Sequence, residues 1–122
     1  MPPALDDKVV TSWNGLTIRA LAEAGAVLGN EDHLSAARDC ANFILDNLID
    51  DDGRLLRSWS QGRASTKAFL EDYGAMATGL FALYQATGEI QWYRSAKRLT
   101  EAAVALFAAE PDAAMFSTGV VA

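Results

Sequence analysis

The chain has 122 residues, a length that suits one domain whose core buries roughly two-thirds of the surface exposed by the unfolded form. Its formal net charge of -6 at pH 7 and its lack of a basic cluster argue against binding to a nucleic-acid backbone. The single cysteine, Cys40, excludes an internal disulfide and a cysteine-based zinc cage, and it fits a reducing compartment. We therefore expect a cytoplasmic protein without a nucleic-acid partner.

Neither of two candidate segments fits a membrane or export signal. The N-terminal segment MPPALDDKVV is too acidic, and has too few apolar residues, for a signal peptide. The uncharged run 73–88 is shorter than the ~20 residues that a span needs, and it includes Thr78 and Gln85. The sequence thus predicts a soluble protein with no membrane partner.

The first part of the chain predicts an extended lead-in followed by a helix. Residues 1–11 contain Pro2 and Pro3, and proline disfavours helix at and before its own position. Ser12 is interpreted as an N-cap, and the pair Gly29-Asn30 as the end of the helix. Between them apolar residues recur at helical spacing and predict the packed face: Trp13, Leu16, Ala20, Leu21, Ala24, Val27 and Leu28.

A second helix is predicted over 32–48, and it is amphipathic. Glu31 and Asp32 supply negative charge where the helix dipole is positive. The turn 50–53 follows, and residues 54–59 and 63–67 predict a short β-hairpin around Gln61-Gly62.

The third predicted helix, 71–88, organises the rest of the chain. After Glu71 and Asp72 it has no charged residue, so no side of the helix is suited to water. We therefore expect it to be buried on every side, more fully than this chain alone can achieve. A fourth, amphipathic helix is predicted over 90–108, before Pro111, and 109–122 is interpreted as an irregular tail.

The two halves of the helical region, 12–48 and 71–108, match without a gap at an offset of 59 residues. Gly15 matches Gly74, Leu21 matches Leu80, and Gly29 matches Gly88. In each half the first helix is poor in charge and the second is amphipathic. This pattern predicts an all-α domain of two helical hairpins, arranged as a curved array with an inner and an outer layer.

Two blocks of the sequence resemble a known family. The segments LDDKVVTSWNGLTIRALAEAG and FLEDYGAMATGLFALYQATGEIQWYRSAKRL are similar to the thioredoxin-domain-containing family that includes spermatogenesis-associated protein 20 and bacterial YyaL. The resemblance covers the chain from about Pro3 to Phe107. It implies two consecutive hairpins of an (α/α)6 toroid, similar to six-hairpin glycosidases and N-acylglucosamine 2-epimerases.

The resemblance also shows what this chain does not contain. It has no CxxC motif, so the family's thioredoxin-like domain is not represented. Two hairpins cannot close a ring of six. We therefore interpret the chain as a fragment, an excised domain or a shortened relative whose open sides are covered by the missing toroid segments or by self-association.

The resemblance implies a ligand pocket at one mouth of the ring, because toroids of the glycosidase kind place acid–base carboxylates and sugar-stacking aromatic rings there. If the two inner helices are parallel, their N-terminal ends lie together. The candidate substrate-binding residues at that end are Asp7, Trp13, Asn14, Glu71, Asp72 and Tyr73. Trp13 and Tyr73 are the candidates for stacking on a carbohydrate ligand, and the acidic residues are the candidate carboxylates.

Each candidate has a simpler structural interpretation. Asp72 and Glu71 suit a first helical turn whatever the function, and a tryptophan at a helix start usually belongs to the core. The sole histidine, His33, weakens an epimerase interpretation, and the turn 50–53 lacks the ligand pattern of a calcium loop. We expect no metal and no cofactor.

Three functional hypotheses remain. The first is a carbohydrate-related toroid segment that is inactive alone because its pocket is incomplete. The second is a helical-hairpin module that binds a protein partner or its own copy. The third is a sugar hydrolase completed by oligomerisation.

Overall fold

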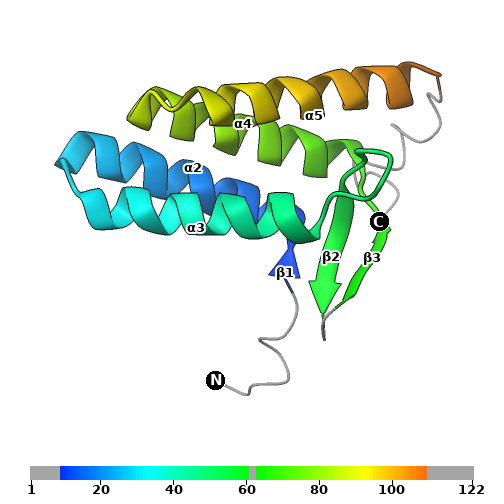
Figure 1. Ribbon diagram of the computed structural model, residues 1–122, viewed down its shortest axis with the longest axis horizontal. Helices are drawn as coiled ribbons and strands as arrows, with labels where there is room; N and C mark the ends of the chain where they lie inside the picture. The colour runs from blue at the N-terminus through cyan, green and yellow to red at the C-terminus, as the bar shows by residue number, and fades with distance from the viewer. Residues whose placement is uncertain (1–8, 61–62, 110–122) are drawn as a thin grey trace.

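The computed structural model describes residues 9–60 and 63–109 (Figure 1). In chain order the elements are β1 (Val9–Val10), α2 (Thr11–Leu28), α3 (Glu31–Asn47), β2 (Leu56–Ser60), β3 (Arg63–Lys67), α4 (Leu70–Thr87) and α5 (Ile90–Ala109). The expected all-α class is confirmed, and the four helix bounds lie within two residues of the predicted ones. The predicted lead-in and tail lie mostly outside the described residues.

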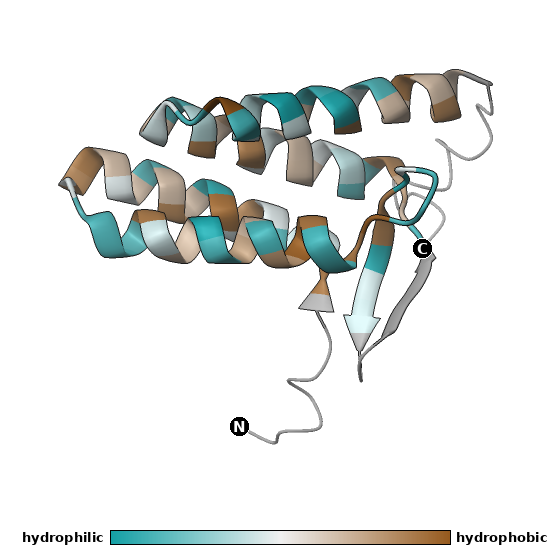
Figure 2. Cartoon of the chain, in the orientation of Figure 1, coloured by the Kyte–Doolittle hydropathy of each residue, from teal (hydrophilic) through white to brown (hydrophobic). Residues whose placement is uncertain are grey.

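The helices form two hairpins, α2 with α3 and α4 with α5, which stack through the pair of helices α2 and α4 (Figure 1). Helices α2 and α4 run in the same direction, so their N-terminal ends lie together beside the sheet. The colouring in Figure 2 shows more hydrophilic residues along α3 and α5 than along α2 and α4. The pair α2 and α4 therefore forms the charge-poor layer, and α3 and α5 form the amphipathic one.

The predicted internal repeat is visible in the structure. Helices α2 and α4 each have 18 residues, and an offset of 59 carries the bounds of one onto the other. Both end at a left-handed glycine, Gly29 with φ 63° and Gly88 with φ 73°, where a residue with a side chain would be strained. The two hairpins are thus copies of one structural unit.

Two glycines let the parallel helices α2 and α4 approach closely. A Cβ atom on Gly15 would lie 2.6 Å from the backbone of Ala75, and one on Gly79 would lie 2.5 Å from the carbonyl oxygen of Gly15. Neither distance is compatible with a side chain. The contact between the hairpins is therefore a backbone-to-backbone contact that requires glycine at both positions.

Helix α2 begins one residue before the predicted N-cap. The residue at the N-cap position is Val10, which has no side-chain acceptor, so the prediction of Ser12 as cap is wrong. The helix start is instead fixed by β1, which pairs with β2, and by Thr11, whose hydroxyl donates to the Leu56 carbonyl at 2.6 Å. At α3, Asn30 is a true side-chain cap that accepts from the backbone N–H groups of Asp32 and His33.

The predicted packed face of α2 is also wrong. The residues that α2 buries are Thr11, Gly15, Ile18, Ala22 and Gly25. Most of the larger apolar residues that the pattern singled out are exposed, including Trp13, Leu16, Val27 and Leu28. The helix turns its small residues toward α3 and α4 because close helix packing requires them.

Helix α4 is the centre of the core, but one of its sides is open. It contacts α2, α3 and α5, and Met76, Leu80 and Leu83 are fully buried. Gly74, Thr78 and Phe81 lie on its exposed side. The described residues therefore do not enclose α4 on every side, and its enclosure by a further segment or a second copy stays a prediction.

The predicted β-hairpin is confirmed and gains a third strand. Strands β2 and β3 pair antiparallel, with Ser60 opposite Arg63, and the short strand β1 pairs with β2 on its other side. In the preceding turn, Asp50 Oδ1 accepts from the backbone N–H groups of Asp52 and Arg54, each at 2.9 Å. The sheet stands at the N-terminal ends of α2 and α4 (Figure 1).

Candidate functional site

The N-terminal ends of α2 and α4 bring most of the predicted site residues to one end of the molecule. Trp13 and Asn14 lie in the first turn of α2, and Glu71, Asp72 and Tyr73 in the first turn of α4. Asp7 lies outside the described residues. The structure thus places these side chains at one end, but their individual contacts show different roles.

Asp72 is completely buried, with no exposed surface. Its Oδ2 accepts a hydrogen bond from the backbone N–H of Phe69 at 2.7 Å, which satisfies a donor at the start of α4. Burial raises the pKa of the Asp72 carboxyl, while the Phe69 bond, Arg57 and the Ser12 hydroxyl act in the opposite direction. The carboxyl therefore has a structural role at the helix start.

Arg57 of β2 also joins this cluster. Its guanidinium lies 3.6 Å from Asp72 Oδ2 and 3.8 Å from a Glu71 carboxylate oxygen, and it stacks 4.4 Å from the centre of the Phe69 ring. Arg57 belongs to β2, which the turn 50–53 brings back toward α4. The sequence signal for this residue is the group Arg54, Arg57 and Arg63 in the predicted hairpin, but the partners of Arg57 depend on the tertiary structure.

Two polar atoms of this cluster have no hydrogen bond to any other described residue. They are Arg57 Nη1 and Asp72 Oδ1, both buried. The Ser12 hydroxyl is near enough to lower the pKa of Asp72, although it makes no well-formed hydrogen bond with Oδ1. The cluster combines one buried and one exposed carboxylate with an arginine between them.

Tyr73 is part of the core and is 2% exposed. Its hydroxyl accepts a hydrogen bond from the backbone N–H of Leu55 at 2.9 Å, and its ring packs edge-on against Phe107 with centroids 5.8 Å apart. Burial raises the pKa of the Tyr73 phenol. With both its ring and its hydroxyl engaged, Tyr73 is not placed to stack on a ligand.

Asn14 is likewise held by structural contacts. Its side-chain amide donates to the Val10 carbonyl at 2.9 Å, and its oxygen accepts from the Cys40 thiol at 3.0 Å. Cys40 thereby joins α3 to the start of α2, and burial raises the pKa of its thiol. Trp13, by contrast, is 68% exposed, so the interpretation of this residue as core is wrong.

Within the described part of the chain, no group of three or more His, Cys, Asp or Glu residues could hold a metal ion. None of the helices described there has the length and apolar character needed to cross a membrane.

The stacked, repeated hairpins define the class of this molecule: a helical-hairpin repeat with a charge-poor layer and an amphipathic layer. No protein-family model matches the chain. Human spermatogenesis-associated protein 20 is 36% identical over 114 residues, which cover 86% of this chain and 14% of the human protein. The chain therefore belongs to the spermatogenesis-associated protein 20 family.

Two further relatives show the same extent of similarity. The rat spermatogenesis-associated protein 20 is 37% identical over 112 residues, covering 84% of this chain and 14% of its own length. The uncharacterized protein B0495.5 of Caenorhabditis elegans is 35% identical over 105 residues, covering 80% of this chain and 14% of its own length. The chain thus spans about one seventh of the relatives that it matches.

Proposed function

We propose that this chain is a packing segment: two consecutive hairpins of an (α/α)6 toroid that build part of the ring wall and have no catalytic activity alone. The observation that supports this function best is the exposed surface of α2 and α4, which is poor in charge: Arg19, Glu23 and Glu71 are its only charged side chains. A self-contained domain keeps charged residues on the side of a helix that faces water.

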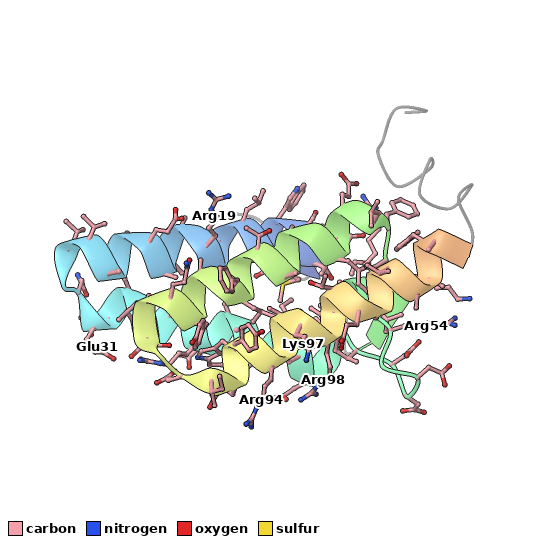
Figure 3. All side chains as sticks on the ribbon, turned by 90° about the horizontal axis from the view of Figure 1, so that it is seen from above. Arg19, Glu31, Arg54, Arg94, Lys97 and Arg98 are labelled. Carbon is pink, nitrogen blue, oxygen red and sulfur yellow. The ribbon has the colours of Figure 1, made fainter. Side chains whose placement is uncertain are left out.

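Large apolar side chains are exposed on both inner helices. Val27 is 83% exposed, Leu16 59% and Phe81 43%. Burying one such side chain stabilises a protein by about 1.5–3 kcal/mol, so a surface that displays several gains from a covering partner. Other charged side chains lie away from this surface: Arg94 and Arg98 project from α5 on the side away from α2 (Figure 3).

The use of the predicted site residues supports the same function. Asp72, Tyr73 and Asn14 are engaged in contacts that fix helix starts and the loop before β2. A self-contained hydrolase needs a pair of free carboxylates placed around a substrate. Here Asp72 is buried and the preceding residue, Glu71, is exposed, so the two carboxylates do not form such a pair.

The test is association with the segments of human spermatogenesis-associated protein 20 that flank the matched stretch. We expect the purified chain to bind at least one purified flanking helical segment in light scattering, and the variant Leu16→Glu/Val27→Glu to bind more weakly. Circular dichroism should show that this variant keeps the parental fold, because both side chains are exposed. No association with any flanking segment, nor of the chain with itself, would contradict the proposal.

A second candidate function is carbohydrate binding by a cytoplasmic protein. The exposure of Trp13 supports it. An exposed indole at the end where Glu71 and Arg57 lie is a suitable surface for stacking on a sugar ring. Titration of the chain with oligosaccharides should then shift tryptophan fluorescence, and Trp13→Phe should remove the shift while Trp59 and Trp92 remain. An unchanged spectrum in the parent chain at millimolar oligosaccharide would count against this function.

A further inference from the structure

The exposed side of α4 corresponds, through the internal repeat, to the side of α2 that packs on α4. The exposed side of α2 corresponds in the same way to the side of α4 that packs on α2. Helix α2 packs on α4, with Gly15 against the α4 backbone, and the buried positions on the Gly15 side of α2 are Thr11, Gly15, Ile18 and Ala22. At an offset of 59 residues these correspond to Leu70, Gly74, Ala77 and Phe81, which form the open side of α4. We call these four α4 residues the α4 edge.

The reverse correspondence also holds. The positions by which α4 packs inward include Asp72, Met76, Gly79 and Leu83, all buried. Their equivalents in α2 are Trp13, Thr17, Ala20 and Ala24, of which the first three are exposed. We call these four α2 residues the α2 edge. Positions that are buried in one of the two helices are therefore mostly exposed at the equivalent positions of the other helix.

Gly74 is the residue that most clearly indicates a missing neighbour. It lies inside α4, where glycine is less favourable than alanine. A Cβ atom on Gly74 would meet nothing within 4 Å, so no contact inside the described chain requires glycine there. Its equivalent, Gly15, is glycine because the backbone of Ala75 lies against it.

An apolar groove runs along the α4 edge between α4 and α5. One part has a volume of about 410 Å³ and is lined by residues that include Leu70, Gly74 and Ala77. The adjoining part has about 540 Å³ and includes Phe81 of α4 with Tyr93 and Lys97 of α5. The groove is therefore long enough to follow the helix along several turns, as a docked helix requires.

We propose that the α4 edge of one chain binds the α2 edge of a second copy, in the same relation as the first hairpin binds the second within each chain. This inference rests on the proposed function as a packing segment and names the occupant of its open side. The contact is head to tail, so every added copy presents a new free edge and association continues beyond a dimer unless a ring closes.

Two positions make the contact between copies wider than the internal one. Ala20 stands where the internal contact has Gly79, and Phe81 stands where it has Ala22. Both are larger, so the backbones of the two copies lie farther apart than those of α2 and α4, and the Phe81 ring fills part of the added space.

The test blocks each edge separately with the same charge. Gly74→Arg blocks the α4 edge. Leu16→Arg blocks the α2 edge, because Leu16 lies beside it and its equivalent in α4, Ala75, lies against Gly15 in the internal contact. Both positions are exposed, so circular dichroism should show the parental fold for each variant. In analytical ultracentrifugation we expect the parent to associate with increasing concentration and each variant alone to remain monomeric.

The decisive sample is an equimolar mixture of the two variants. Each variant keeps the edge that the other has lost, so a head-to-tail contact predicts a 1:1 heterodimer that grows no further. A Gly74→Ala variant adds a milder test: at least a several-fold weaker association, with a folded monomer.

The outcomes separate this inference from the proposed function. A monomeric parent that binds the flanking segments of the human relative would overturn the second-copy inference and leave the packing function standing. A mixture that remains monomeric, or a Gly74→Arg variant that still associates alone, would also overturn the inference. Failure to bind either kind of partner would overturn both.

Discussion

Tyr73 connects three parts of the molecule: α4, the end of α5 and the loop before β2. Its ring contacts Phe107, and its hydroxyl provides the acceptor for the buried N–H of Leu55. A residue that looked like a stacking platform in the sequence is thus a core residue with one polar contact.

We expect Tyr73→Phe to lower the free energy of unfolding by about 1–3 kcal/mol, because the Leu55 N–H is left buried without an acceptor. The change keeps the ring and its packing against Phe107. Urea denaturation measures the loss, and Tyr93→Phe is the matched control because Tyr93 is exposed. An equal effect of the two substitutions would show that the Leu55 bond contributes nothing specific.

The raised pKa of the buried Asp72 carboxyl predicts that the free energy of unfolding depends on pH. Burial raises its pKa in the folded state above that in the unfolded chain, so the folded chain binds this proton more tightly. Between the usual carboxyl pKa and the raised one, the contribution of Asp72 to the free energy of unfolding falls as pH rises. Asp72→Asn keeps an acceptor for Phe69 and removes this dependence.

The measurement compares urea denaturation of the parent and of Asp72→Asn across the acidic range. Glu89 acts with the opposite sign, since hydrogen bonds from Arg38 and Trp92 lower its pKa and its contribution is lost as pH falls. The difference between the two proteins therefore isolates Asp72. A difference that does not change with pH would contradict the prediction.

At the scale of elements, the crossing of α2 and α4 depends on glycine. Gly15→Ala should destabilise the chain by about 1–3 kcal/mol, because the new Cβ would lie 2.6 Å from the Ala75 backbone and the helices must separate. Thermal unfolding followed by circular dichroism measures the change.

The repeat offers the matched control for this prediction. Gly74→Ala is the equivalent substitution in α4, and we expect it to stabilise the monomer by about 0.5–1 kcal/mol, because its Cβ meets nothing and alanine favours helix. The two substitutions should therefore have opposite signs. Destabilisation by both would show that the surroundings of the two glycines do not differ as described.

At the scale of the whole molecule, the fold depends on a core centred on α4. Leu80 is fully buried within it, and Leu80→Asp places an unpaired charge where no water reaches. We expect this variant to be unfolded, as judged by loss of helical circular dichroism. Thr78→Asp, on the exposed side of the same helix, should keep the fold; a folded Leu80→Asp variant would contradict the assigned core.

The hairpin array also depends on a network at its turns. Arg38 bonds to Glu89 at 3.0 Å and to Glu31 at 2.8 Å, and thereby joins the two hairpins at the end opposite the sheet. Such partly exposed pairs contribute about 0.2–1 kcal/mol, far less than the buried core. The stacking of the hairpins therefore depends mainly on apolar packing and on the glycine contact.

Reasoning from the sequence correctly predicted the number and order of the helices, their bounds within two residues, the β-hairpin and the internal repeat. Local signals explain this success: left-handed glycines end the first and third helices, and the charge pattern separates the charge-poor pair of helices from the amphipathic pair (Figure 2). These properties are set by residues close together in the chain.

The buried faces of the helices and the contacts of the polar residues became known from the packed fold. The larger apolar residues of α2 are exposed because Gly15 and Gly79 bring the backbone of α4 against the opposite side of the helix. The spacing of hydrophobic residues does not predict a contact that is made by residues without side chains. Arg57 reaches Asp72 only because β2 folds back to the start of α4. Such roles depend on distances between remote segments, which the order of residues alone does not specify.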